Sequence, residues 1–360
     1  MNLLSKSIEQ ITNAKKIAIL VHQNADTDAL ASAIAMRRII CDNTDKFGTK
    51  FCIDIFTDTA NFNKKDEYLI KNEKINHQSR KKYDLSICLD CSDRQRFSIY
   101  DDLIFKKSKT TLNIDHHESN TFFAKNNIVI PKCSSTCEII YLLFSKFLKL
   151  KCSTQTKALL YCGIITDTNN LTQNIGKKTY NVIDEIVKVS VQNGIDIEKI
   201  RNHYFKSNTK ERNALLARAL SSLTYSENGK IAMMKITKQD FNETGASQVD
   251  TLGIVNFAAD TEGVEVGIIF IKQEDNTYYV SLRSKNDNIN VAEIAKVMGG
   301  GGHSKVAAFQ STANDNLTDM KAKLTNLCNN QIANAKTFEE DISSLFAEFI
   351  EKDELNDLKQ

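Results

Sequence analysis

The chain has 360 residues and a formal net charge of +2, with 41% hydrophobic and 26% charged residues. This length suffices for two domains with hydrophobic cores, and the composition excludes a disordered chain. Its apolar runs are far shorter than the roughly 18 residues that cross a bilayer, and residues 1–16 lack the apolar stretch of a signal peptide. We therefore expect a cytoplasmic protein without membrane contact.

Charge is distributed unevenly along the chain. Residues 338–360 contain eight acidic residues and two lysines, so the remaining residues carry the positive charge. A mildly basic body attracts anionic substrates, but the chain lacks the dense Lys/Arg stripe of a duplex-DNA-binding protein. Apolar residues in the acidic tail have a helical spacing, which predicts a helix that docks on the body or contacts a partner, including a second copy in a homodimer: Ile342, Leu345, Phe346, Phe349 and Ile350.

The first half of the sequence alternates predicted strands and helices. The predicted strands are Lys16–Val21, Phe51–Phe56, Leu85–Leu89, Thr111–Ile114 and Ile128–Ile130, and the predicted helices are 29–40, 135–150 and 154–165. This alternation predicts an α/β fold with a mostly parallel sheet and helices on both faces. In such sheets the ligand site lies outside the carboxyl ends of the strands.

The second half begins with a long helical pattern and then forms a second set of elements. Predicted strands at 230–236, 264–272 and 278–283 and helices at 237–244 and 291–298 indicate a smaller α/β domain. We therefore divide the chain into four parts, which are a catalytic domain (1–190), a helical connector (191–222), a smaller domain (223–315), and C-terminal helices with the acidic tail (316–360).

Four clusters of acidic residues and histidines fall at the ends of predicted elements in the first domain. They are His22–Asp28, Asp90–Asp93, Asp115–His117 and Asp167–Asn170. Segments this far apart in sequence can meet at the carboxyl edge of a parallel sheet. Carboxylate with imidazole suits Mn²⁺ or Mg²⁺, with some tolerance for Fe or Co. Together the clusters predict a two-metal hydrolase centre.

The spacing within the clusters suggests how the ligands are shared. Asp26 and Asp28 can each reach a different ion, and Asp90 at the end of a buried strand is placed to bridge both ions. The other predicted ligands complete the two coordination spheres: His22, His116 and Asp167. Two ions about 3.5–4 Å apart activate water and clamp a phosphoryl oxygen for in-line attack.

The two remaining residues of the third cluster are predicted to act beside the metals. His117 would bind or protonate the phosphate or the leaving oxygen, and Asp115 would orient the histidines. Each cluster also has a simpler interpretation when taken alone. Asp26 or Asp28 could serve only as a helix N-cap, and Asp90 could be a turn residue. The joint occurrence at strand ends favours the metal centre.

Other potential metal ligands are interpreted as structural. Cys88 and Cys91 have the C-x-x-C spacing of a redox or zinc site, but Cys88 falls in a predicted buried strand and no second cysteine pair matches. The nine cysteines are scattered through apolar runs, as is typical of free thiols in a reducing compartment. His77 is expected to be solvated in a lysine-rich loop, and His203 to pack in the connector.

A run of four glycines, Gly299–Gly302, precedes His303 in the second domain. Four glycines in a folded domain carry a high entropic cost. Backbone N–H groups at Gly300, Gly301 and Gly302 could approach a phosphate or a stacked base closely. His303 with the strand residues Arg283 and Ser284 would supply further donors. The alternative is a tight turn that packs against the other domain.

The four clusters, in order and spacing, resemble motifs I–IV of the DHH phosphoesterases. Ser281–Ser284 with the glycine run and His303 resembles the DHH-associated C-terminal domain, and the resemblance covers about residues 10–315. Within the family the chain is similar to the bifunctional oligoribonucleases and 3′-phosphoadenosine-5′-phosphate (pAp) phosphatases. These are Mn²⁺-dependent (Mg²⁺ or Co²⁺ being alternatives here), act on short single-stranded RNA and mononucleotide bisphosphates, and use the C-terminal domain to close over the catalytic cleft.

The resemblance implies a role for each motif residue. One metal would be held by His22, Asp26 and Asp90, and the other by Asp28, Asp90, His116 and Asp167. Substrate would be gripped by Arg283, Ser284, the glycines and His303. Three positions depart from the family pattern, since Thr27 and Asn169 stand where glycine is usual and Phe309 replaces another glycine. None of the departures removes a metal ligand.

Other functions remain open on the same chemistry. Hydrolysis of a cyclic dinucleotide, or of a linear one such as pApA or pGpG, is one, although membrane-bound relatives of that type carry additional domains that we do not find here. A single-strand DNA exonuclease would usually add an oligonucleotide-binding barrel, and a pyrophosphatase of the related type lacks the glycine motif. A nucleotide-binding module without activity would be missing a ligand, whereas every expected ligand is present.

Overall fold

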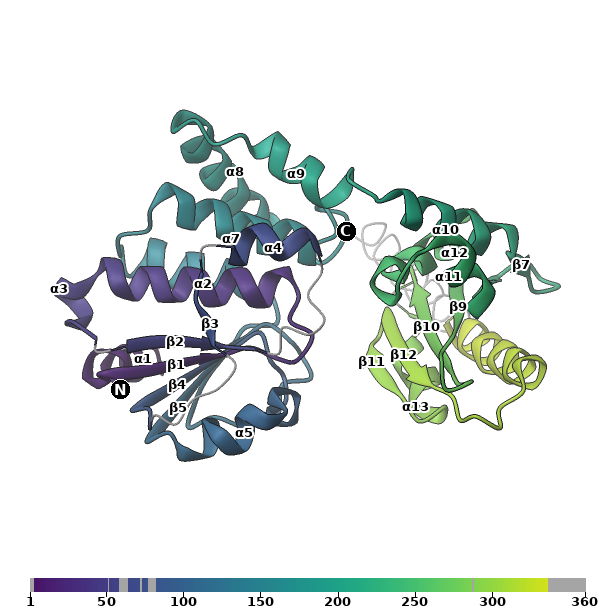
Figure 1. Cartoon of the computed structure of the whole chain (residues 1–360), viewed down its shortest axis with the longest axis horizontal. Helices are drawn as coiled ribbons and strands as arrows, with labels where there is room; N and C mark the ends of the chain where they lie inside the picture. Colours follow the sequence, from purple (N-terminus) through teal and green to yellow (C-terminus); the bar gives the residue numbers. More distant parts are fainter. Residues whose placement is uncertain are drawn as a thin grey trace, which may run out of the picture. The chain divides into compact units, whose positions relative to one another are not determined.

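The computed structural model describes residues 3–50, 52–57, 64–71, 73–76, 82–286 and 288–335. The predicted acidic helix and His77 lie outside these residues. The chain divides into two compact units, Met1–Ser207 and Asn208–Gln360 (Figure 1). Helix α9 (Ile197–Phe205) belongs to the first unit and α10 (Lys210–Ser221) to the second, so the residues predicted as a connector are divided between the units.

A six-stranded parallel sheet forms the centre of the first unit, in the order β3-β2-β1-β4-β5-β6. Its strands are β1 (Lys16–Leu20), β2 (Cys52–Phe56), β3 (Ile75–Asn76), β4 (Leu85–Leu89), β5 (Thr110–Asp115) and β6 (Asn126–Val129). The prediction of a mostly parallel sheet is confirmed. Chain order reverses between β1 and β4, and a ligand site in such a sheet is expected at this switch point.

Helices cover both faces of this sheet (Figure 1). The principal helices are α1 (Leu3–Asn13), α2 (Thr27–Asp42), α5 (Ile99–Leu103), α6 (Thr136–Ile140), α7 (Thr154–Asp167) and α8 (Lys177–Gln192), with the short α3 (Thr44–Phe47) and α4 (Glu67–Ile70). The helix predicted over 135–150 is α6 followed by a π-helical segment, Tyr141–Phe147. Helices α2 and α7 lie on one face, and α5 lies on the other.

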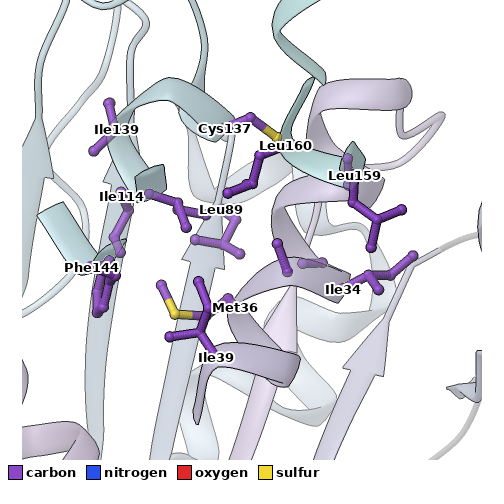
Figure 2. Packing of buried hydrophobic residues seen from close by; sticks show 14 of the residues in the cluster. Ile34, Met36, Ile39, Leu89, Ile114, Cys137, Ile139, Phe144, Leu159 and Leu160 are labelled. Carbon is purple, nitrogen blue, oxygen red and sulfur yellow. The ribbon is translucent and has the colours of Figure 1, made fainter. Parts of the chain in front are cut away.

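Successive side chains of each strand point to opposite faces, so a separate hydrophobic core forms on each face of the sheet. Ile17 and Ile19 of β1 pack in the core under α2 and α7, whereas Ala18 and Leu20 belong to the core that includes Phe97 beside α5. Figure 2 shows the larger core, in which side chains of α2, the strands and α7 interdigitate. Both faces of the strands are apolar, as is typical of a parallel sheet, and the two cores fix the strand ends that carry the site.

The second unit contains a mixed sheet in the order β11-β12-β10-β9-β8-β7, in which only β8 and β9 are parallel. Its strands are β7 (Thr224–Tyr225), β8 (Ile231–Ile236), β9 (Val266–Lys272), β10 (Tyr278–Ser284), β11 (Gly301–His303) and β12 (Val306–Gln310). Its helices are α10, α11 (Lys238–Thr244), α12 (Ile254–Ala259), α13 (Val291–Val297) and a helix over 317–335.

The cysteines are free thiols throughout. Cys88 and Cys91 are buried, and burial raises the pKa of Cys88 well above its ordinary value, so this pair packs as apolar side chains. Within the described part of the chain, no helix combines the length and the apolar character needed to cross a membrane.

Candidate metal centre and anion-binding face

The first cluster extends from the end of β1 into the first turn of α2. The Nδ1 atom of His22 donates to the carbonyl of Gln23 at 2.7 Å, and Nε2 lies 3.9 Å from Oδ2 of Asp90. Asp26 is the N-cap of α2, and its Oδ1 accepts from the amide of Ala29 at 3.0 Å. The capping interpretation of Asp26 is therefore correct, and it is compatible with metal binding because it occupies only one carboxylate oxygen.

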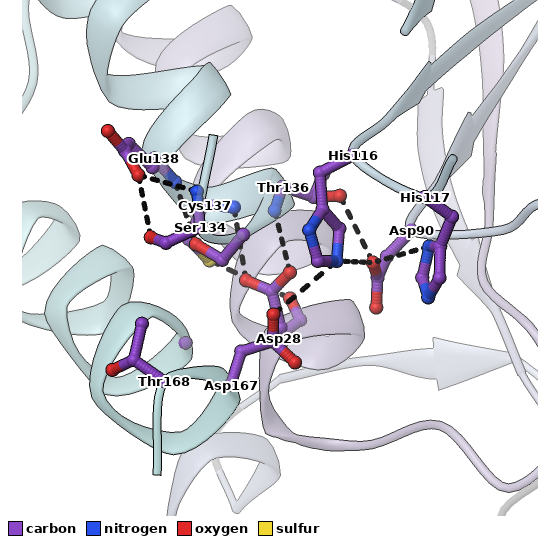
Figure 3. Close-up of polar contacts among 12 residues, drawn as sticks. Asp28, Asp90, His116, His117, Ser134, Thr136, Cys137, Glu138, Asp167 and Thr168 are labelled. Carbon is purple, nitrogen blue, oxygen red and sulfur yellow. Dashed lines mark hydrogen bonds and ion pairs between the residues drawn. The ribbon is translucent and has the colours of Figure 1, made fainter. Parts of the chain in front are cut away.

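Asp28 is fully enclosed in the first turn of α2. It is 1% exposed, and its two oxygens accept the backbone amides of Thr136 at 2.7 Å and Cys137 at 3.0 Å (Figure 3). Burial, followed by the charges of Asp90 and Asp167, raises the pKa of Asp28 well above its ordinary value. The two backbone amides fix the position of the Asp28 carboxylate, while the negative charges of Asp90 and Asp167 disfavour its ionisation.

Asp90 lies at the centre of the cluster, directly after β4. It is 2% exposed and has a φ of 54°, in the left-handed region that is uncommon for aspartate. Thr136 Oγ1 donates to its Oδ1 at 3.1 Å, and His116 Nε2 lies 3.5 Å from the same oxygen (Figure 3). Burial and the nearby charge of Asp26 raise the pKa of Asp90.

Asp167 ends α7 and approaches the cluster from the opposite side to β4. Its Oδ2 lies 3.4 Å from Nε2 of His116, is buried, and accepts no hydrogen bond from the described residues. Burial, then Asp90 and Asp26, raise its pKa well above the ordinary value. The next loop contains Asn169 with a φ of 46°, so asparagine adopts there the left-handed conformation that glycine would adopt.

Asp115 and His117 form a directly bonded pair beside these ligands. Oδ1 of Asp115 accepts from Nδ1 of His117 at 2.7 Å and from the amide of His116 at 2.9 Å. Nδ2 of Asn120 donates to Oδ2 at 2.6 Å. Burial opposes ionisation of Asp115, but the hydrogen bonds from His117 and Asn120 hold its pKa below the ordinary value.

The pKa of His117 is displaced in the opposite direction. Burial acts to lower it, but the hydrogen bond to Asp115 and the charge of Asp90, whose Oδ1 lies 3.7 Å from Nδ1, raise it to about 9. The His117 ring is therefore held as a cation near neutral pH in this arrangement, with Asp115 fixing its orientation.

The structure brings all six predicted ligands into three overlapping groups. In each group one donor atom per residue lies within 4.8 Å of the others: His22, Asp26 and Asp90; Asp28, His116 and Asp167; and Asp90, His116 and His117. Three buried carboxylates with raised pKa values, Asp28, Asp90 and Asp167, together with the unbonded oxygen of Asp167, fit divalent cations, which would offset the negative charge. The oxygen and imidazole donors suit Mn²⁺ or a similar ion.

Three residues that support this centre carry no signal in the sequence. Thr136 bonds both Asp28 and Asp90, and Asn120 fixes Asp115. A Cβ on Gly163 of α7 would lie 2.6 Å from Oδ1 of Asp28. These contacts depend on how α6 and α7 pack against α2, which no local pattern encodes.

The second unit places the other predicted site residues on β10 and at β11, two strands that β12 joins. Antiparallel pairing aligns Arg283 with Val306 and Val306 with His303, and it aligns Ser281 with Ala308 and Ala308 with Gly301. Paired residues share a face of the sheet. We define the Arg283 face as the side chains on that side of these strands: Tyr279, Ser281, Arg283, Gly301, His303, Val306, Ala308 and Gln310.

Arg283 is the cationic centre of this face. Nη1 donates to Oγ of Ser281 at 3.1 Å and to the carbonyl of Leu282 at 2.9 Å. Among the described residues, no carboxylate lies within ion-pair distance of the guanidinium, and burial lowers its pKa. A largely enclosed guanidinium without an acidic partner fits an anionic ligand such as a phosphate.

Ser284 lies on the other face of β10. It is 6% exposed, and its hydroxyl donates to the carbonyl of Asn286 at 3.3 Å and accepts the amide of Asn286 at 3.2 Å. The structure therefore does not bring Ser284 together with Arg283, contrary to our expectation. Ser281, two residues earlier, is the serine that contacts the guanidinium.

The glycine run has a packing role in addition to any role in binding. A Cβ at Gly300 would lie 2.2 Å from the carbonyl oxygen of Ala308, and one at Gly302 would lie 2.3 Å from that of Val306. Both glycines are therefore needed for β12 to lie alongside. Gly300 also packs within this unit against Phe309, which is buried in its core. Gly299 and Gly301 are exposed, and a Cβ at either would meet no atom within 4 Å; of the two, Gly301 lies on the Arg283 face.

Comparison with known families matches both units. Residues 16–164 match the N-terminal domain of the DHH family, and residues 228–330 match the DHHA1 domain. The probable bifunctional oligoribonuclease and PAP phosphatase NrnA of Streptococcus mutans is 30% identical, over 86% of this chain and 94% of that protein. The chain belongs to the DHH family of phosphoesterases. The clustered acidic residues and histidines of the first unit lie within the part of the chain that matches the DHH domain, apart from Asp167, which lies just beyond it.

Other relatives of this DHH phosphoesterase differ in the chemistry that their names describe. The cyclic-di-AMP phosphodiesterase GdpP of Geobacillus thermodenitrificans is 26% identical over 84% of this chain, which spans 45% of that protein. An exopolyphosphatase-related protein from Bacteroides fragilis has a solved structure that matches with a TM-score of 0.79 at 20% identity, covering 91% of this chain and 97% of that one. The structural match supports the fold.

Proposed function

We propose that this DHH phosphoesterase releases mononucleotides from short oligoribonucleotides and converts pAp to AMP. The observation that carries the proposal is the pair of ligand groups around Asp90, one with His22 and Asp26 and one beside it with Asp28, His116 and Asp167. The similarity to the Streptococcus mutans protein over nearly its whole length supports this choice of substrates.

Two divalent cations, which we propose to be Mn²⁺, would supply positive charge for the phosphoryl oxygens and lower the pKa of the attacking water. His22, Asp26 and Asp90 would hold one ion, and Asp28, Asp90, His116 and Asp167 the other. Asp90 would be shared, since its two oxygens face His22 and His116 respectively.

The protein's own groups would complete the reaction. Water would add to phosphorus and release one of its protons to solvent as the bond to the leaving oxygen breaks, and His117, held as a cation by Asp115, would donate a proton to that oxygen. Arg283 would bind a phosphate of the substrate, and Ser281 would hold the guanidinium in place. Exposed Gly301 and His303 would contribute to the same grip.

A second candidate is hydrolysis of a cyclic or linear dinucleotide, because the similarity to GdpP also covers both units. The two candidates are separated by a panel of pAp, RNA of two to five nucleotides, pApA and cyclic di-AMP, compared by kcat/KM with Mn²⁺. We expect pAp and short RNA to be turned over at least about tenfold better than cyclic di-AMP. The reverse order would replace the proposal by the second candidate, and no metal-dependent turnover of any member would contradict both.

A further inference from the structure

Tyr279 is an exposed aromatic residue on the Arg283 face. Along β10, Tyr279, Ser281 and Arg283 alternate with Val280 and Leu282, which are fully buried in the core. The Tyr279 side chain is 42% exposed. Successive residues of a strand point to opposite faces, so this exposed ring lies on the same side of β10 as the guanidinium.

The Arg283 side chain folds back along the strand toward Tyr279. Its Nη1 bonds Ser281, the residue that lies between the two on this face, and Tyr279 is the titratable group that, besides burial, acts on the pKa of Arg283. Residues two apart in a strand are separated by roughly 6.6 Å. The phosphate-binding group and the ring are thus neighbours on the sheet.

A hollow lies near the ring, since Gln310, which pairs with Tyr279 across the sheet, lines a cavity of about 520 Å³ together with Lys272 and Gln273. Nothing among the described side chains covers the Tyr279 ring in the way that α13 and the helix over 317–335 cover Val280 and Leu282 on the other face.

We infer that Tyr279 is a stacking platform for the base of the nucleotide whose phosphate Arg283 binds. The inference rests on the proposed function, since it takes the ligand to be a nucleotide. A cation and an exposed aromatic ring side by side on a sheet suit a phosphate joined to a planar base. Every base has a π-face, so such a platform binds nucleotides with little preference for sequence, which suits an enzyme that degrades RNA ends.

Calorimetric titration of the full chain, at one fixed Mn²⁺ concentration, tests the inference with AMP and with ribose 5-phosphate, which lacks the base. We expect Tyr279→Ala to weaken AMP binding by about 5- to 150-fold and to leave ribose 5-phosphate binding unchanged. Tyr279→Phe should retain AMP affinity. Tyr225→Ala, at another exposed tyrosine of this unit (50% exposed), is the matched control and should bind both ligands as the wild type does.

Arg283→Ala should weaken both ligands, because both carry the phosphate. Unchanged AMP affinity in Tyr279→Ala would overturn the inference. An equal loss of affinity for AMP and for ribose 5-phosphate would also overturn it, and so would a wild-type protein that binds AMP no more tightly than ribose 5-phosphate. This readout is independent of turnover. If Tyr279 contributes selectively to AMP binding but neither pAp nor short RNA is hydrolysed, the proposed function is contradicted, whereas the inference that Tyr279 stacks against the base is retained.

Discussion

Gly163 of α7 lies directly against Asp28 of α2. A Cβ at this glycine would fall 2.6 Å from Oδ1 of Asp28 and 2.4 Å from Sγ of Cys137. The absence of a side chain therefore lets α7 approach the carboxylate while Asp28 keeps its two bonds to the amides of Thr136 and Cys137. Gly163 therefore permits this close packing of α7 against α2 and α6 at the candidate metal centre.

Gly163→Ala is expected to reduce both stability and activity. The added methyl group must displace Asp28 or Cys137, and overpacking of this kind costs about 1–3 kcal/mol. Urea unfolding and Mn²⁺-dependent hydrolysis measure the two effects. Gly176→Ala is the control, because a Cβ there meets nothing within 4 Å. In Gly163→Ala with Cys137→Ala, stability should recover more than activity, since the collision with Asp28 remains. Wild-type behaviour of Gly163→Ala would contradict this account.

The clustering of the predicted ligands could be expected from the sequence, whereas the residues that support them could not. Asp90 and His116 follow apolar strands, and parallel strands bring their carboxyl ends to one edge whatever the details of packing. Gly163 and Thr136 act only through the contact of helices with one another. Their role depends on helix positions that no short sequence pattern specifies.

The assignment of Ser284 failed for a different reason. The resemblance to the family motif assigned Ser284, the residue next to Arg283, to the substrate site. Adjacent residues of a strand, however, point to opposite faces. Ser281, at an even spacing from Arg283, meets the guanidinium. The predicted strand over 278–283 already contained this information, because the alternation of its side chains places Ser281 on the same face as Arg283. The packing of Gly300 and Gly302 on β12, in contrast, could not be read from the glycine run itself.

Asp90→Asn is expected to lower Mn²⁺-dependent hydrolysis by more than about 100-fold, since outer residues of metal sites alone account for 10- to 100-fold effects. In the metal-free protein the same change should raise Tm at pH 7.5, because it removes one of several buried negative charges. Scanning calorimetry with and without Mn²⁺ measures this. A metal-free Tm below that of the wild type would show that Asp90 stabilises the fold by itself.

The wild-type protein should show a matching dependence on pH. The pKa values of Asp28, Asp90 and Asp167 are raised by folding, so the folded state binds more protons than the unfolded state and stability rises as pH falls from 7 toward about 4. His117, raised to about 9, acts in the same direction above about pH 6.5. Metal-free protein should thus have a higher Tm at pH 5.5 than at pH 7.5, and Mn²⁺ should add more to Tm at pH 7.5. Equal Tm values would contradict this.

His117→Asn is expected to lower kcat by roughly 10²- to 10⁴-fold, the usual contribution of a general acid. The protonated ring is the active form, so wild-type activity should fall as pH rises through the pKa of His117, which bound cations would hold below its metal-free value of about 9 because they offset the charge of Asp90. Asp115→Asn removes the bonded carboxylate that raises this pKa, and should move the fall to lower pH. Profiles of kcat against pH test both variants. A substrate with an activated leaving group, which needs no acid, should lose less in His117→Asn, and an equal loss would contradict the assignment of His117 as the proton donor.

Thr27, between the ligands Asp26 and Asp28, is tied to a buried carboxyl group. Its hydroxyl donates to Oδ1 of Asp66 at 2.8 Å, and the hydroxyl of Tyr204 in α9 donates to the same oxygen at 3.1 Å. Burial raises the pKa of Asp66 to about 6 despite both bonds. This pair of bonds holds the ligand loop to the last helix of the first unit.

Thr27→Val should therefore raise the Mn²⁺ concentration for half-maximal activity by about 10-fold, within the range for residues that orient metal ligands. It should also cost about 1–3 kcal/mol of stability, because a donor to a buried carboxyl is lost. Thr27→Ser keeps the hydroxyl, so it should need the same Mn²⁺ concentration as the wild type for half-maximal activity. Tyr83→Phe breaks a similar buried bond, to Asp54 at 2.7 Å within the sheet. Tyr83→Phe should lower stability without changing the Mn²⁺ concentration for half-maximal activity. If Tyr83→Phe raised that concentration as much as Thr27→Val does, Thr27 would act only through stability.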